Sequence, residues 1–131
     1  MIVFSRAGSV PAEPNAAPPL APLTAAIDRE HLSRMTLGDR SLEREVLALF
    51  DRQAELLLTR MRKASPVVAA AAAHTLKGSA RGIGAWRVAN AAEALELAAP
   101  GQMAEFKAAL AALSAAVDES KSAIADLLLA N

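Results

Sequence analysis

The chain has 131 residues, enough for one domain and too few for two domains that each have a core. Alanine supplies 33 of these residues and aromatic side chains only 3%, a composition that suits close-packed helices and not sheet faces. The absence of cysteine excludes disulfides, thiolate zinc sites and a cysteine nucleophile. The 14 basic and 14 acidic residues cancel, so the net charge gives no reason to expect nucleic acid or an anionic membrane as a partner.

The N-terminal stretch differs in composition from the rest of the chain. Residues 1–22 contain five of the seven prolines, among alanines. Because proline lacks the amide donor and disfavours helix at the residue before it, we predict a flexible Pro/Ala-rich lead over 1–22 and a single domain over 23–131. No apolar run approaches the roughly 20 residues of a membrane span and no signal-peptide core is present, so we expect a cytoplasmic protein.

Helical periodicity begins at Thr24. The spacing predicts a short helix over 24–37, with Ile27, Leu32 and Met35 facing inward and Gly38 ending it. A long second helix is predicted over 39–64. Its apolar positions are Leu42, Val46, Leu49, Phe50, Leu57 and Met61.

Three further helices are predicted. Ser65 as N-cap and Pro66 at the first helical position begin the third helix, which is expected to run to about Arg81, before Gly82 and Gly84. A fourth is predicted over 85–98 and a last one after Pro100-Gly101. Their inward positions are Val88, Ala92 and Leu95, then Phe106, Leu110, Leu113, Val117, Ile124 and Leu127 or Leu128. Short connections favour an all-α fold, an antiparallel up-down four-helix bundle with a short extra N-terminal helix.

The balanced total charge conceals a basic middle. Residues 56–92 contain no acidic side chain and six basic ones, whereas residues 1–55 sum to −2 and residues 93–131 to −4. His74 lies within this basic stretch. Lys77, Gly78 and Arg81 share its helix face at i+3, i+4 and i+7, and the same stripe continues back through Ala71, Ala70 and Val67. The opposite face, which consists of Val68, Ala72, Leu76 and Ile83, is apolar and is predicted to be buried.

The residues near His74 exclude several kinds of chemistry for its imidazole. A metal site needs further ligands at suitable spacing, Ser79 at i+5 is misplaced for a hydrolase triad, and the glycines form no nucleotide-binding loop. Covalent chemistry on the imidazole remains, with Lys77 beside it to stabilise an added phosphoryl charge and Gly78 leaving room for a partner. His31, in an ordinary polar helix start, is interpreted as a surface residue or a satisfied core residue without a chemical role.

The residues around His74 form a recognisable pattern. Ala73-His74-Thr75-Leu76-Lys77-Gly78-Ser79-Ala80 is followed by Ile83-Gly84-Ala85 and Ala92-Glu93-Ala94-Leu95-Glu96, and preceded by Ile27-Asp28, Leu32, Gly38-Asp39 and Leu49-Phe50. Over about residues 25–128 the chain resembles the histidine phosphotransfer (HPt) domain family of bacterial phosphorelays.

The resemblance implies a role for each site residue. His74 would be the phosphoacceptor, modified at Nε2, Lys77 would steady the phosphoryl charge, and Gly78 would give steric room. Glu96 falls where some relatives have a glutamine that touches the imidazole, and a solvent-facing glutamate is the alternative. Ala70, Ala71, Arg81 and Arg87 are candidate docking residues, the two arginines alternatively a solvated face, and Trp86 is expected to pack at a helix junction.

The resemblance further implies a phosphorelay intermediate with no kinase activity of its own. Its partners would be response-regulator receiver domains and a sensor or hybrid histidine kinase. We expect a monomer that binds no cofactor, with Mg²⁺ held by the receiver. Two other functions remain open: a non-catalytic helical adaptor that binds receivers or kinases, and a structural bundle that dimerises through the seam of the last helix.

Overall fold

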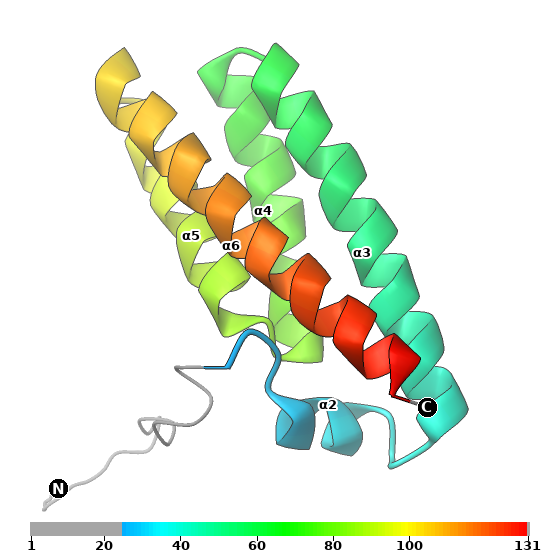
Figure 1. Cartoon of the computed structure of the whole chain (residues 1–131). Helices are drawn as coiled ribbons and strands as arrows, with labels where there is room; N and C mark the ends of the chain where they lie inside the picture. The colour runs from blue at the N-terminus through cyan, green and yellow to red at the C-terminus, as the bar shows by residue number, and fades with distance from the viewer. Residues whose placement is uncertain (1–24, 131) are drawn as a thin grey trace, which may run out of the picture.

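The computed structural model describes residues 25–130, so the predicted lead over 1–22 lies outside the described residues. Five helices and no strand are present in this part of the chain: α2 Arg29–Met35, α3 Arg40–Lys63, α4 Pro66–Ile83, α5 Trp86–Ala98 and α6 Met103–Leu129. Helices α3 to α6 form an up-down four-helix bundle, and α2 lies at the end where α3 begins and α6 ends (Figure 1). The predicted all-α class and bundle are confirmed.

Local chemistry sets most of the helix boundaries. The Asp39 and Ser65 side chains accept hydrogen bonds from the amides of Leu42 and Val68, so they cap α3 and α4 as the sequence indicates. Helix α4 continues to Ile83, two residues past the predicted end, since Gly82 remains helical. Gly84 adopts the left-handed conformation, with φ of 84°, that ends it.

Within the described residues, the helix predicted over 24–37 starts later and ends earlier than expected. Its first turn is replaced by a cap, because the Asp28 carboxylate accepts a hydrogen bond from the His31 amide at 3.1 Å. Beyond Met35, Leu37 has a positive φ of 56° and Gly38 one of 74°, which no right-handed helix tolerates. Helix α2 is therefore only seven residues long.

Tertiary packing at three points anchors α2 to the turn between α4 and α5. The Asp28 amide donates to the Gly84 carbonyl at 2.9 Å, and the Trp86 indole donates to the Asp28 carboxylate at 2.9 Å. The His31 ring packs edge-on against Trp86, with the ring centroids 4.9 Å apart. Trp86 thus lies at the helix junction, as predicted, and His31 is half-buried beside it, as a packing residue is.

The hydrophobic core of the bundle is formed by the inward faces of α3, α4, α5 and α6. The predicted inward positions of α5 are buried, and the α6 seam is buried or partly buried along its length. Other predicted positions are exposed: Met35, Leu42, Leu49 and Val68. In α3, Leu47, Ala54 and Leu58 are buried instead. Its apolar residues cover more than one face, and contact with α4 and α6 decides which is buried.

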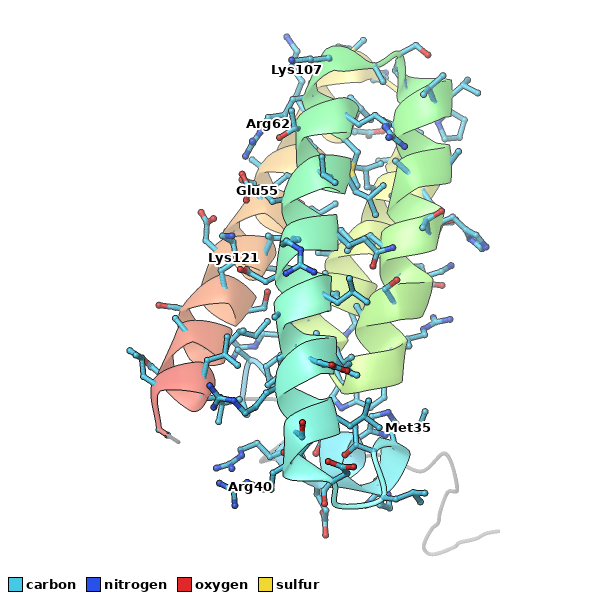
Figure 2. All side chains as sticks on the ribbon, turned by 90° about the vertical axis from the view of Figure 1, so that its right-hand side faces the viewer. Met35, Arg40, Glu55, Arg62, Lys107 and Lys121 are labelled. Atoms are coloured by element: carbon cyan, nitrogen blue, oxygen red, sulfur yellow. The ribbon has the colours of Figure 1, made fainter. Side chains whose placement is uncertain are left out.

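Polar contacts also join α3 to α6. The Lys121 ammonium lies 3.0 Å from the Asp51 carboxylate and 3.4 Å from that of Glu55, between the two helices (Figure 2). Hydrogen bonding to Asp51 raises the pKa of Lys121 against the opposing effect of its partial burial. Within residues 25–130, no helix has the length and apolar character needed to cross a bilayer.

Candidate functional site

His74 lies in the middle of α4 with its side chain 70% exposed. Because α4 and α5 run antiparallel through the turn at Gly84, the ring meets Glu96, 22 residues later, on α5. The Nδ1 atom of His74 lies 2.8 Å from Oε2 of Glu96. One ring nitrogen is thereby held by the neighbouring helix while the ring as a whole faces solvent.

Lys77 contacts the other oxygen of the same carboxylate. Its ammonium lies 2.7 Å from Oε1 of Glu96, and its side chain is only 14% exposed. The sequence places Lys77 on the exposed face beside His74, whereas the structure turns it toward α5 and largely covers it. Glu96 therefore joins the imidazole and the ammonium into one group across the α4–α5 boundary.

The charge of Glu96 follows from these contacts. Partial burial favours its neutral form, but hydrogen bonds from Lys77 and His74 outweigh that effect and hold the pKa of Glu96 below its usual value. At neutral pH the carboxylate is ionised and can only accept hydrogen bonds. Nδ1 of His74 must then bear the proton, which leaves the lone pair of a neutral ring on Nε2.

Small side chains surround the exposed ring on its own helix. A Cβ atom built at Gly78 would meet no atom within 4 Å, so its surface is open space. Ala70 is partly exposed and Ala71 exposed, and one turn further back Val67 is 79% exposed. The α4 surface near His74 is thus low and partly apolar, and a second protein surface can approach it closely.

The two predicted docking arginines lie at different distances from this surface. Arg81 remains on α4 and lies 3.6 Å from Glu93 of α5, with both side chains about half exposed. Arg87 lies in the first turn of α5 and pairs with Glu119 of α6 at 2.8 Å. The structure therefore brings Arg81 to the His74 side of the bundle and directs Arg87 toward α6. The docking roles of both arginines stay predictions.

Sequence reasoning missed the hollows between α3 and α4. One, of about 200 Å³, is lined by Val46, Leu49, Phe50, Gln53, Ser79 and Ile83. The other, of about 240 Å³, is lined by Leu57, Arg60, Val68, Ala71, Ala72 and Thr75. The sequence contains one indication of them: α3 has more apolar residues than a single buried helix face requires. Within residues 25–130 no group of three or more potential metal-ligating side chains is found.

A pH titration tests the bond network of Glu96. Because its folded-state pKa is lowered, the stabilisation by the carboxylate is present above the unfolded-state pKa, about 4.3, and is lost as pH falls through the folded value. The Glu96→Gln variant lacks this titration. We expect the wild type to be the more stable at pH 7, and the difference in unfolding free energy to shrink between about pH 5 and pH 3. Urea unfolding of both proteins at each pH measures it, and a difference independent of pH would contradict the assignment.

Comparison with known proteins agrees with this geometry. The family model described as the Hpt domain matches residues 44–123, more than half of the chain. The matched segment contains His74, Lys77, Gly78 and Glu96 and most of the four-helix bundle. Searches of curated proteins and of solved structures found no match. The chain therefore belongs to the Hpt domain family, the histidine phosphotransfer domains that act with receiver domains and kinases in phosphorelays.

Proposed function

We propose that this protein is a phosphorelay intermediate in which Nε2 of His74 accepts a phosphoryl group from a receiver-domain aspartate, or from a kinase, and passes it to the aspartate of another receiver. The observation that supports it is the His74–Glu96–Lys77 group, an exposed imidazole whose Nδ1 is 2.8 Å from a carboxylate. We place the protein in the bacterial cytoplasm, as a monomer without kinase activity of its own.

The transfer step requires no general base from this protein. The Nε2 lone pair attacks phosphorus as the bond from phosphorus to the aspartyl oxygen breaks, and the carboxylate leaves with that electron pair. Nδ1 keeps its proton throughout, so the new phosphoimidazole has its remaining N–H directed at Glu96. The reverse reaction regenerates the aspartyl phosphate. Catalysis is then mainly positioning and charge stabilisation, with Mg²⁺ supplied by the receiver.

Glu96 has two effects in this proposal. It selects the tautomer with the lone pair on Nε2, and it stabilises the positive charge that develops on the ring as the bond to phosphorus forms. Lys77 offsets the negative charge that Glu96 would otherwise place near an incoming phosphoryl group. Lys77 follows His74 by about one helical turn, and its ammonium shares the Glu96 carboxylate with the ring, so its positive charge lies close to the site of transfer.

The open surface of α4 supports a protein partner and not a small molecule. Val67, Ala71 and Gly78 leave the ring accessible, and the hollows between α3 and α4 continue the apolar surface beside it. The basic excess of residues 56–92 complements the acidic pocket of a receiver, and such complementarity mainly accelerates association.

Phosphotransfer from a panel of radiolabelled phospho-receivers and kinases to the purified protein tests the function. We expect rapid labelling by at least one donor, with a phosphoryl linkage that is labile to acid and stable to alkali, as a phosphoimidazole is. A second, unlabelled receiver should remove the label. If no donor labels the protein while a receiver still binds it, the relay is excluded and the adaptor function replaces it.

Substitution of Gly78 separates stability from transfer. In Gly78→Ala the new Cβ meets no atom, and alanine favours the helix over glycine, so the free energy of unfolding should rise by up to about 1 kcal/mol. The same methyl group lies one turn from His74 on the docking surface. It should lower the transfer rate, and Gly78→Gln, with its longer side chain, should lower it by about 100-fold.

Gly82→Ala is the matched control, because Gly82 is also helical with nothing near its Cβ position. Urea unfolding and single-turnover phosphotransfer measure the two effects. Equal transfer rates in the wild type and Gly78→Gln would show that no partner surface approaches Gly78.

A further inference from the structure

A hollow of about 80 Å³ is lined by residues of α2, the start of α3 and the end of α6. These three segments lie together at one end of the bundle (Figure 1). Arg29, Arg40, Arg44 and Glu43 supply its charged side chains. Its apolar lining consists of Leu32, Leu47 and Leu127. Arg40 is at the α2 end of α3, in its first turn (Figure 2). The helix turn that bears His74 contributes none of these residues.

The arginines of this hollow are not neutralised by ion pairs. Within residues 25–130, none of the ion pairs involves Arg29, Arg40 or Arg44. Three arginines and one glutamate give the hollow a formal excess of two positive charges. Positive charges gathered around one small space repel one another, and an anion bound among them reduces that repulsion.

Two contacts fix parts of the hollow in place. Arg44 donates from Nη1 to the Leu128 carbonyl at 2.9 Å, which ties α3 to the last turn of α6. The Thr36 hydroxyl lies 3.4 Å from the Glu43 carboxylate, which holds the one acidic group toward α2. Leu32 and Leu47 are buried and form part of the same lining, and an apolar lining strengthens the field of charges close to it.

We propose that this hollow binds a phosphate group, as inorganic phosphate or as the terminal group of a phosphomonoester, at a site separate from His74. A dianionic phosphate balances the excess of two positive charges. Arginine forks match its oxygens in pairs of parallel hydrogen bonds. A space of about 80 Å³ exceeds what a single water needs and is of the size for one such tetrahedral group.

Titration of the purified protein with inorganic phosphate, at constant ionic strength adjusted with sodium chloride, tests the site. NMR of the arginine Nε–Hε groups reports binding directly, and the thermal midpoint reports it through stabilisation. We expect saturable shifts of the Arg29, Arg40 and Arg44 signals. A parallel titration with phenyl phosphate asks whether a monoester enters, and tighter binding than that of inorganic phosphate would identify the ester as the preferred source.

Charge substitutions of opposite sign sharpen the test. Arg40→Gln, at an exposed position without an ion pair, should weaken phosphate binding about three- to tenfold. Glu43→Gln removes the single negative charge and should tighten binding by about threefold or more, whereas a merely structural role of Glu43 predicts no gain. Arg52→Gln, on the exposed surface of α3 outside the hollow, is the matched control and should bind as the wild type does.

The result is independent of the proposed relay. Binding measured in the His74→Gln variant should equal that of the wild type, because His74 does not line the hollow. Non-saturable shifts, or equal shifts of all arginine signals including Arg52, would show general screening and overturn the site. Saturable shifts confined to Arg81 and its surroundings would place phosphate at the His74 surface instead, and would also overturn it.

Discussion

The His74→Gln variant is expected to lose phosphoryl acceptance completely, by at least about 1,000-fold, while it keeps its fold and its receiver affinity. An amide nitrogen has no available lone pair for attack on phosphorus. Glutamine can still donate a hydrogen bond to Glu96, so the carboxylate keeps a partner from α4 as well as Lys77. Single-turnover transfer from a labelled receiver measures the rate, and titration calorimetry with the unphosphorylated receiver measures the affinity.

His31 provides the internal control for this prediction, because the chain has only two histidines. The His31 ring packs against Trp86 at the helix junction and its Nε2 is buried, so His31→Gln should leave the labelling intact. Label that persists in His74→Gln and disappears in His31→Gln would refute the assignment of the phosphoacceptor. A receiver affinity that falls more than about tenfold in His74→Gln would show that the ring is also needed for docking.

The Gly84→Ala variant is expected to lose about 2–4 kcal/mol of stability, the largest effect of a methyl group added at any glycine within residues 25–130. Gly84 has a φ of 84°, which costs a residue with a Cβ about 1 kcal/mol or more. The added Cβ would also lie 2.9 Å from both Cβ and the carbonyl oxygen of Asp28, closer than such atoms approach. Relief of that contact requires α2 to move away from the turn between α4 and α5.

Gly38→Ala separates the two causes. Gly38 has a similar φ of 74° but no atom within 4 Å of a built Cβ, so it should lose only about 1 kcal/mol. Urea unfolding measures both variants. Trp86, the single tryptophan, donates to Asp28 and should change its fluorescence in Gly84→Ala alone. Equal losses in the two variants would mean that the approach of Asp28 to Gly84 is unimportant.

The sequence by itself determined the four helices of the bundle, their order and the face that His74 presents. The Ser65-Pro66 cap, the glycines after α4 and the 3–4 spacing of apolar residues act within a few residues of one another, so these features can be predicted without the fold. The seam of α6 was predicted for the same reason. Even the pairing of His74 with Glu96 was available as an expectation, through the resemblance to a family and not through spacing.

Only the tertiary structure decided which of several apolar faces is buried and which charges meet. Local spacing cannot distinguish Leu49 from Leu47 in α3, because both belong to apolar stripes and contact with α4 and α6 makes the choice. The predicted early start of α2 is replaced by the Asp28 cap, and contacts of Asp28 with Gly84 and Trp86, more than 50 residues away, hold that cap in place. The same reason applies to Lys77, which α5 covers, and to the three arginines from two helices that line one hollow. Both arrangements depend on the approach of segments that are distant in the chain.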